Sequence, residues 1–451
     1  MITITIPDNN INERDYIINI LFKEFLGLDY KIIYGSKDYI IELENKNQLI
    51  IIDSFFNKFP NNLEYLSFKN IPSNVKFFRN NFIMEEDIPV IFGNNILKVK
   101  NKKNILCGID IFASSFFMLT RWEEYVNKNR DNYNRFPATE SLAYKNNFLD
   151  RPIINEYVEM LWNMFRYLDI KQNRMVREYE LILTHDVDYL YYWKGYKQFL
   201  RQIASDIIKK KDILLALKNS KEYVFIKIKK IKDPYDTFDW IMDKSEEIGV
   251  KSRFYFMSGG VTQYDNRYNI SEEKSLDLIE KIKSRGHIIG IHPSYNAYNN
   301  FEQLKKEKDL LASITQEFIE EGREHYLRFE APTTWQIWED NGLKIDSTCG
   351  YSDKIGFRCG TSDVYSVFNF LTRKQLKLKE RPLIVMETSL IGNYTNFITS
   401  KDLIDKINYL KNKTIKYHST FVLLWHNSNL TVEQKINYKN VYEHILKENE
   451  I

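Results

Sequence analysis

The sequence has few cysteines, no long apolar run and little net charge. Its 451 residues include three cysteines, Cys107, Cys349 and Cys359, and no Cys-x-x-Cys pair. Three cysteines cannot all pair within one chain, which argues against a disulfide framework or a cysteine zinc site and fits a reducing compartment. No run approaches the ~18 apolar residues that a membrane-spanning helix needs. We therefore expect no membrane span.

The N-terminus also lacks the pattern of a secretory signal. Residues 1–10 predict a short strand ending at Pro7, with no basic flank before an apolar core. We therefore expect a cytoplasmic protein. The formal net charge of +3 gives no argument for a nucleic-acid partner or an anionic membrane. The lysine-rich stretches 209–211 and 227–232 alternate with apolar residues, which favours the solvated face of a helix.

The sequence divides into two regions that differ in the spacing of their apolar residues. In residues 1–175, short strand-like runs at 2–6, 31–34, 39–43 and 49–52 precede amphipathic helices predicted at 110–125 and 155–167. We interpret this region as a smaller α/β N-terminal domain without a catalytic constellation. We expect it to dock on the second domain and to shape substrate access. The polar stretch 169–174 predicts a linker.

In residues 176–451, strand-length apolar runs alternate with longer helical segments. Strands are predicted at 179–183, 252–257, 287–291, 326–329, 344–346, 383–386 and 421–425. Helices are predicted at 271–286 and 301–322, and a lysine-rich helical insertion at about 191–235. Strand–helix alternation of this length implies a parallel sheet, either as a barrel or as an open doubly wound sheet.

Polar residues directly follow several of these predicted strands. The run 181–183 leads into Thr184–Asp188, which reads Thr-His-Asp-Val-Asp, and the run 288–291 leads into His292. Unpaired buried charge costs several kcal/mol, so such residues usually hold a metal, a proton or an ion pair. A capping loop with solvated aspartates is the alternative for the first motif. Because parallel strands end on one rim, we expect these segments to form one site.

Histidines concentrate in the same places. Five of the seven lie in or beside these segments: His185, His287, His292, His325 and His426. For His287 and His325, packing in the core is the alternative to a role in the site, and for Arg328 it is a structural ion pair. The nearby Trp335 and Trp338 are compatible with sugar stacking, although core packing explains most aromatic residues better.

With these motifs in view, residues 177 to about 430 resemble the polysaccharide deacetylase (NodB-homology) family of carbohydrate esterases. Thr184–Asp188 occupies the place of that family's Thr-Phe-Asp-Asp-Gly motif. Gly286–His292 matches the family's Gly-His-x-Ile-Gly-x-His, with Asn296 at the position of its last histidine. Arg328 with Pro332 loosely matches its Arg–Pro motif.

The region 424–426 matches the family's final Leu-His motif. Proteins of the Thr-His-Asp-Val-Asp branch commonly carry an additional region like residues 1–175 before the deacetylase-like part.

The resemblance implies a distorted (β/α)7 barrel and metal-dependent removal of an acyl group, typically acetyl, from an N-acylated sugar. It implies Asp186 as catalytic base, Arg328 as the ion-pair partner of Asp186, and His426 as general acid. The implied cofactor is a divalent metal ion, zinc or another first-row transition metal. Its implied ligands are Asp188 and His292, with Asn296 or His185 as further candidates.

These patterns together predict a bacterial hydrolase acting on carbon–nitrogen bonds other than peptide bonds. The expected substrate is an N-acetylated sugar or a nucleotide- or lipid-linked glycan precursor of a surface polysaccharide. Two alternatives stay open, an amidohydrolase acting on a non-sugar N-acyl group and a catalytically silent glycan-binding or scaffold protein. Asn296 keeps the silent alternative open, because an amide is a weaker metal ligand than imidazole.

Overall fold

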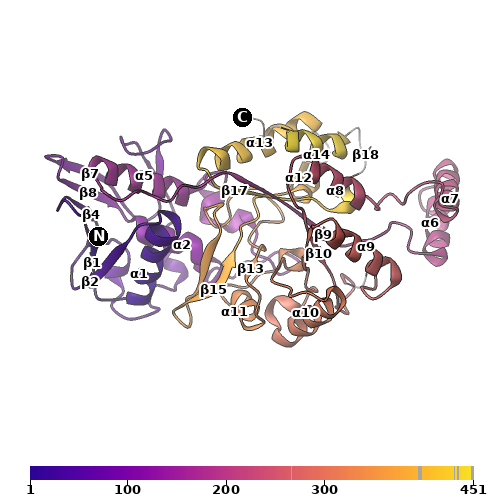
Figure 1. Ribbon diagram of the computed structural model, residues 1–451, viewed down its shortest axis with the longest axis horizontal. Helices are drawn as coiled ribbons and strands as arrows, with labels where there is room; N and C mark the ends of the chain where they lie inside the picture. The colour runs from indigo at the N-terminus through magenta and orange to yellow at the C-terminus, as the bar shows by residue number, and fades with distance from the viewer. Residues whose placement is uncertain (266, 395–398, 431, 434–435, 448–451) are drawn as a thin grey trace.

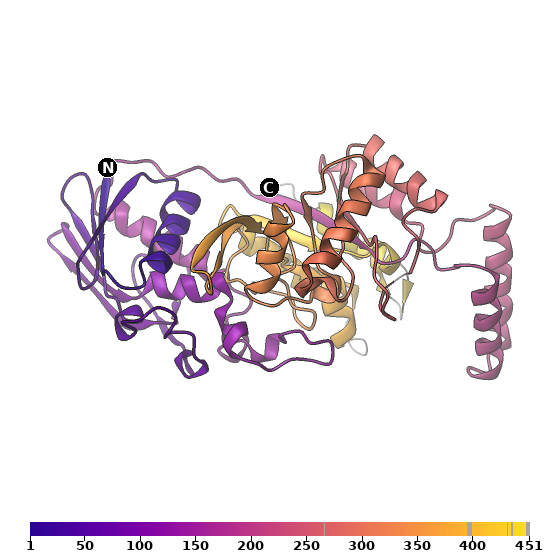
Figure 2. The same cartoon turned by 90° about the horizontal axis from the view of Figure 1, so that it is seen from below.

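The computed structural model describes residues 1–451 except 266, 395–398, 431, 434–435 and 448–451. Two main sheets with surrounding helices follow one another along the long axis of the molecule (Figure 1). A helical hairpin projects from the end opposite the N-terminal sheet, and the view from below shows it standing clear of the body (Figure 2). No helix in the described part of the chain is long and apolar enough to cross a bilayer.

The N-terminal sheet has six strands in the order β2-β1-β3-β4-β8-β7. They are β1 (Ile2–Ile6), β2 (Tyr30–Tyr34), β3 (Tyr39–Glu42), β4 (Gln48–Ile51), β7 (Gly93–Lys100) and β8 (Asn104–Ile109). Alternate residues of β1 are buried, as expected of a strand with one face on a core. The four strands predicted before residue 53 are thus confirmed to within one residue. A separate antiparallel pair contains β5 (Lys76–Phe78) and β6 (Ile88–Val90).

The helices of this region are α1 (Ile11–Ile18), α2 (Ile111–Thr120), α3 (Trp122–Val126), α4 (Leu142–Lys145) and α5 (Ile153–Tyr167). Asp110 caps α2, because its side chain accepts a hydrogen bond from the backbone N–H of Ala113. The single helix predicted at 110–125 is two helices in the structure. Arg121 separates them with a left-handed backbone conformation, φ 54°.

The second sheet has nine strands in the order β14-β15-β13-β12-β11-β10-β9-β17-β16. They are β9 (Glu180–Val187), β10 (Arg253–Phe256), β11 (Ile288–Ile291), β12 (Glu321–Gly322), β13 (Ile345–Asp346), β14 (Tyr365–Asn369), β15 (Lys374–Glu380), β16 (Val385–Met386) and β17 (Thr420–Leu424). All neighbours are parallel except β14 and β15.

This arrangement confirms a mixed α/β architecture with a parallel sheet. Within the described residues the hydrogen-bonded order has two ends, β14 and β16, so strand pairing does not close the sheet. The distorted (β/α)7 barrel therefore stays a prediction.

One predicted strand is wrong. The run 326–329 is not extended, because Tyr326 and Leu327 have φ values of 61° and 55° in a short 3-10 turn. The strand of this region, β12, lies five residues earlier and is only two residues long. Gly322 belongs there for a steric reason, since a Cβ at this position would lie 2.0 Å from the carbonyl oxygen of Ile291.

The helices of the second region include α8 (Phe238–Glu247), α9 (Glu273–Ser284), α10 (Phe301–Thr315), α11 (Thr333–Asp340), α12 (Glu387–Tyr394), α13 (Ser400–Lys416) and α14 (Tyr438–Lys447). The lysine-rich segment 191–235 contains α6 (Tyr196–Ile208) and α7 (Ile213–Lys227). The helix predicted at 301–322 ends at Thr315, because Gln316 adopts a left-handed conformation.

Side chains join the N-terminal third to the second sheet. Arg358 donates from Nε to Glu124 at 2.9 Å, and both side chains are buried. The hydroxyl of Tyr16 donates to the carbonyl of Ser366 at 2.9 Å. Most buried hydrophobic residues of both regions form one cluster, and a smaller separate cluster contains Ile182, Leu327, Leu383, Met386, Val422 and Leu424. The site described next therefore rests on a core shared by the two sheets.

Candidate functional site

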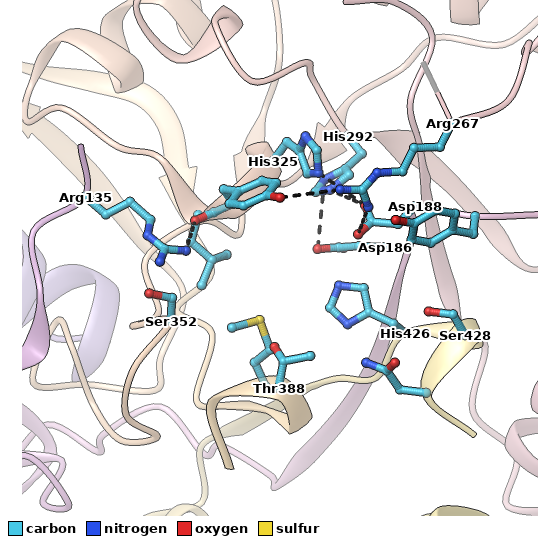
Figure 3. Close-up of a pocket in the computed structure, with 15 residues that line it drawn as sticks. Arg135, Asp186, Asp188, Arg267, His292, His325, Ser352, Thr388, His426 and Ser428 are labelled. Atoms are coloured by element: carbon cyan, nitrogen blue, oxygen red, sulfur yellow. Dashed lines mark hydrogen bonds and ion pairs between the residues drawn. The ribbon is translucent and has the colours of Figure 1, made fainter. Parts of the chain in front are cut away.

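A pocket of about 350 Å³ lies where several parallel strands end (Figure 3). β9 places Asp186 within the pocket wall and Asp188 just beyond the strand end, and β11 is followed directly by His292. His426 follows β17 by two residues, and His325 comes from the turn after β12. Three of the segments predicted to share one rim, at 184–188, 292 and 426, do share it, because parallel strands leave their carboxyl ends on the same side.

Asp188, His292 and His325 form a candidate metal cluster. Asp188 Oδ1 lies 3.4 Å from His292 Nε2 and 3.5 Å from His325 Nε2. One ligand atom from each residue lies within 4.8 Å of the other two. Asp188 Oδ1 and both ring nitrogens of His325 are buried without a hydrogen-bond partner. Such orphaned atoms are costly, and a carboxylate with two imidazoles is a donor set that suits a first-row divalent cation.

The surroundings of the two rings set their tautomers. His292 Nδ1 lies 2.7 Å from the carbonyl oxygen of Arg323, so we assign the hydrogen to Nδ1 and leave the Nε2 lone pair facing Asp188. His325 Nδ1 lies 3.5 Å from Asp265 Oδ1, a carboxylate that orients the ring. Burial lowers the pKa of His325, so this imidazole is neutral at pH 7. The His325 ring is thus in the form that binds a cation, and His292 presents its Nε2 toward Asp188.

Asp186 is held by a buried arginine. Arg323 Nη1 donates to Asp186 Oδ1 at 2.8 Å, and the Arg323 side chain is fully buried. The same guanidinium donates to the Thr184 hydroxyl at 3.0 Å and to the carbonyl of Ser347 at 2.8 Å. These contacts fix the orientation of the Asp186 carboxylate beside the metal cluster.

His426 lines the same pocket as Asp186 (Figure 3) and is paired with Glu387. His426 Nδ1 lies 2.6 Å from Glu387 Oε1, which also accepts from Asn429 Nδ2 at 2.8 Å. Burial alone lowers the pKa of His426, but the charge and hydrogen bond of Glu387, with the charges of Asp188 and Asp186, raise it to about 9. The ring is therefore protonated at pH 7 and can donate a proton into the pocket.

His185 is not part of the cluster, which corrects one predicted ligand. Its Nδ1 lies 2.7 Å from the carbonyl oxygen of Trp425, and its Nε2 lies 3.3 Å from the Ser252 hydroxyl. Both nitrogens are engaged on the far side of β9, because successive side chains of a strand point to opposite faces. Burial lowers the pKa of His185 to about 4.

Asn296 and Arg328 contact each other, and neither belongs to the metal cluster or to the Asp186 ion pair. Arg328 Nη1 donates to Asn296 Oδ1 at 3.1 Å, and its guanidinium carbon lies 3.9 Å from the ring centre of Tyr295. The predicted pairing of Arg328 with Asp186 is wrong, because Arg323 makes that ion pair. The predicted ligand position of Asn296 is likewise taken by His325.

The sequence interpretation missed Arg323 and Glu387 and left His325 undecided. Arg323 and His325 follow β12 by one and three residues, yet a strand of two residues leaves no apolar run to mark it. Glu387 directly follows β16 and obeys the same strand-end rule as the other site residues. The rule was therefore sufficient for Glu387, whereas the short β12 hid the other two.

Two further arginines line the pocket. Arg267 Nη1 donates to Asp188 Oδ2 at 2.8 Å, and its guanidinium carbon lies 4.5 Å from the ring centre of Tyr189. Arg135 comes from the N-terminal third of the chain and donates to the carbonyl of Tyr326 at 3.0 Å. The wall of the pocket is thus built from both regions.

Trp335 and Trp338 do not line this pocket. Both are fully buried, and their indole N–H groups donate to Glu380 at 3.0 Å and to Glu324 at 2.7 Å. The core-packing interpretation of these two aromatic residues is confirmed.

Comparison with known families leaves the chain only partly assigned. A family model described as a family of unknown function, DUF7033, matches residues 2–169. A search of curated proteins finds no match for the sequence.

Solved structures that resemble the chain include deacetylase-like proteins. A candidate polysaccharide deacetylase from Mycobacterium smegmatis has 13% identity and a TM-score of 0.38, covering 60% of this chain and 83% of its own. A probable polysaccharide deacetylase from Pseudomonas aeruginosa PAO1 has 10% identity and a TM-score of 0.35, covering 60% and 84%. A CE4 family pseudoenzyme from Bacillus anthracis has 9% identity and a TM-score of 0.26, covering 59% and 61%. These similarities are too low for the function of those proteins to transfer to this chain.

Proposed function

We propose that this protein is a metal-dependent hydrolase that removes an acyl group, typically acetyl, from an N-acylated sugar. One observation carries the proposal. A cluster that fits a divalent cation, Asp188, His292 and His325, shares a pocket with a paired carboxylate, Asp186, and a protonated histidine, His426. A proton donor and a proton acceptor beside a cation site are what hydrolysis of an unreactive amide requires.

Each side chain has a defined task in this proposal. Asp188, His292 and His325 would hold the cation, which supplies polarisation of the acyl carbonyl and a lowered pKa for the attacking water. Asp186 accepts the proton of that water, in an orientation set by Arg323. His426 donates its proton to the leaving amine, and Glu387 keeps the ring charged and oriented. Each well-placed acid or base contributes roughly 10²–10⁴ to the rate.

The proposed substrate is an N-acetylated sugar unit, free or in a nucleotide- or lipid-linked precursor of a bacterial surface polysaccharide. The resemblance of the motifs at 184–188 and 286–292 to the deacetylase family supports this substrate class. The two arginines and the charged histidine of the pocket favour a substrate that carries negative charge close to the sugar.

A catalytically silent glycan-binding protein is the second candidate, and one observation favours it. Arg267 already pairs with Asp188 at 2.8 Å, which puts a permanent positive charge beside the expected cation. Against it, His325 provides the second imidazole that Asn296 does not, so the donor set remains complete.

Metal binding and acyl release separate the two candidates. We expect the purified protein to bind one equivalent of zinc or cobalt by calorimetry, and His325→Ala to lose it. His418→Ala, which changes an exposed histidine, is the matched control and should bind like the wild type. Acetate release from N-acetylated oligosaccharides should fall by about 10²–10⁴ in Asp186→Asn, while metal content stays unchanged. Glycan binding without metal or acetate release would establish the silent candidate instead.

A further inference from the structure

The α6–α7 hairpin is a self-contained unit that stands away from the body of the protein (Figure 1, Figure 2). Phe199 of α6 stacks on Tyr223 of α7 with ring centres 4.2 Å apart. The buried carboxylate of Asp206 accepts hydrogen bonds from Gln202 at 2.9 Å and Asn219 at 2.7 Å. These contacts hold the two helices together without support from either sheet.

The chain segments that enter and leave the hairpin are tied to each other at its base. The carboxylate of Asp233 accepts from the backbone N–H groups of Tyr192 at 2.8 Å and Trp193 at 3.1 Å. The indole of Trp193 donates to Glu222 of α7 at 2.9 Å. The hairpin therefore has a defined root as well as a defined shape.

Positive charge is concentrated in the hairpin segment, although the net charge of the whole chain is small. Residues 194–232 contain twelve lysines and arginines against three acids, a formal net charge of +9, whereas the whole chain carries +3. All other residues together therefore carry −6. The small overall charge results from opposite charges on two parts of the molecule, so it does not argue against an anionic partner for this part.

Large apolar side chains accompany this charge and are not covered. At the turn between the helices, Ile208, Ile213 and Leu214 are 72%, 65% and 79% exposed and flank the lysines at 209–211. Further exposed apolar residues lie along both helices and just beyond: Tyr196, Leu200, Ile207, Leu217, Val224, Ile228 and Ile231. The lysines are solvated as expected, but the apolar residues between them are exposed and do not pack into a hydrophobic core. Exposed apolar surface of this kind marks an interaction site.

We propose that the α6–α7 hairpin docks this protein on a membrane surface that contains anionic lipid. Lysines interact with acidic headgroups, and the apolar side chains at the turn enter the boundary between headgroups and acyl chains. The hairpin lies on such a surface and does not span it, because α6 and α7 have only 13 and 15 residues. No residue of 194–232 lines the catalytic pocket, so this proposal is independent of the proposed hydrolase function.

Two other binding partners would suit the hairpin less well. A second copy would bring two segments of charge +9 together, which is repulsive. A nucleic acid would satisfy the lysines through its phosphates but would leave the exposed isoleucine and leucine side chains at the turn in water. An anionic lipid surface satisfies both the charge and the apolar side chains.

Co-sedimentation of the full-length protein with vesicles tests the proposal. We expect binding to vesicles of phosphatidylcholine with phosphatidylglycerol, weakening with added salt, and none to phosphatidylcholine alone. Ile208→Ser with Leu214→Ser, and separately Lys209→Gln with Lys211→Gln and Lys218→Gln, should each weaken binding by about tenfold or more. All five residues are exposed, so both variants should keep the circular dichroism spectrum and melting temperature of the wild type.

The matched control changes three exposed lysines elsewhere, Lys98, Lys100 and Lys102, to glutamine. It removes the same charge from the β7–β8 end and should bind vesicles like the wild type. Equal binding by the control and hairpin variants would overturn the proposal, as would no binding to either vesicle. Binding to duplex DNA that only the lysine variant loses would assign the hairpin to nucleic acid. A dimer in light scattering that the Ile208–Leu214 variant dissociates would assign it to a second copy.

Discussion

At the scale of single residues, the hydrogen-bond partners of the two ring nitrogens decide whether a buried histidine is structural or free to bind a ligand. His185 and His325 are both buried, but His185 has partners for both nitrogens and His325 has none within hydrogen-bonding geometry. A satisfied ring is a structural residue, whereas the unsatisfied buried ring of His325, beside a carboxylate, is the one that we propose as a metal ligand. Hydrogen-bond partners, and not residue type, separate the two roles.

The pKa of His426 leads to a prediction about pH. Because His426 donates a proton in the proposed reaction, activity should fall as the pH rises through about 9, where the ring loses its charge. Glu387→Gln removes the charge that raises this pKa, so the alkaline limb of the profile of kcat/KM against pH should move to lower pH. Ser428→Ala, another change at the pocket wall, should leave the limb in place. An unshifted limb in Glu387→Gln would contradict the role of His426.

The two arginines near the site should respond differently to substitution. Arg323→Met leaves the buried Asp186 carboxylate unpaired, which should cost about 3–5 kcal/mol of unfolding free energy and abolish acyl release. Arg328→Met removes a guanidinium that stacks on Tyr295, so it should leave the Asp186 ion pair intact and retain most activity. Urea unfolding and acetate release measure the two effects. A larger loss of activity in the Arg328 variant would restore the assignment made from sequence.

At the scale of elements, the short strand β12 positions two groups of the site. It pairs with β11 through Gly322 and Ile291, and Arg323 and His325 follow it directly. Its neighbour β11 is followed directly by His292, and β9, three strands away in the same sheet, delivers Asp186 to the same rim. A strand of two residues can do this because its neighbours on both sides hold its register.

Gly322→Ala tests how closely β12 must approach β11. The added Cβ would lie 2.0 Å from the carbonyl oxygen of Ile291, so the strands must separate. We expect a loss of about 1–3 kcal/mol in unfolding free energy. We also expect weaker metal binding, because His325 moves with the strand. Metal titration and thermal unfolding measure both, and a variant with unchanged affinity would show that β12 does not position His325.

At the scale of the whole molecule, the N-terminal third and the second sheet are joined by buried contacts and by charge. Glu85 accepts from Lys416 Nζ at 2.7 Å and from the Tyr417 hydroxyl at 2.8 Å, both at the end of α13. Burial would raise the pKa of Glu85, but these hydrogen bonds and the lysine charges lower it to about 2. The contact therefore stabilises the joined molecule only while Glu85 is ionised.

The sign of this shift predicts how stability depends on pH. The contribution of Glu85 should be fully present above its ordinary pKa of 4.5 and lost as the pH falls toward about 2. After solvent screening we expect a contribution of about 1 kcal/mol. Glu85→Gln should reduce unfolding free energy by this amount at pH 7 and by progressively less as the pH falls toward 2. Glu86→Gln, which changes a neighbouring acid that is 91% exposed, should have no such dependence.

Local patterns were sufficient for some of these features. The alternation of apolar and polar residues along β1 and the apolar runs before Asp186 and His292 are visible residue by residue, and parallel strands must end on one rim. The proximity of Asp188 and His292 follows from the shared rim of the parallel strands alone. Glu387 was equally accessible by the same rule.

Other features depended on packing between segments far apart in the chain. A two-residue strand has no periodicity of its own, so only its neighbours place Arg323 beside Asp186 and His325 beside Asp188. The charge of the α6–α7 hairpin can be counted from the sequence, but whether its isoleucines and leucines are covered depends on where the hairpin stands. Burial is a property of the whole molecule, because any segment can be covered only by others that reach it in space.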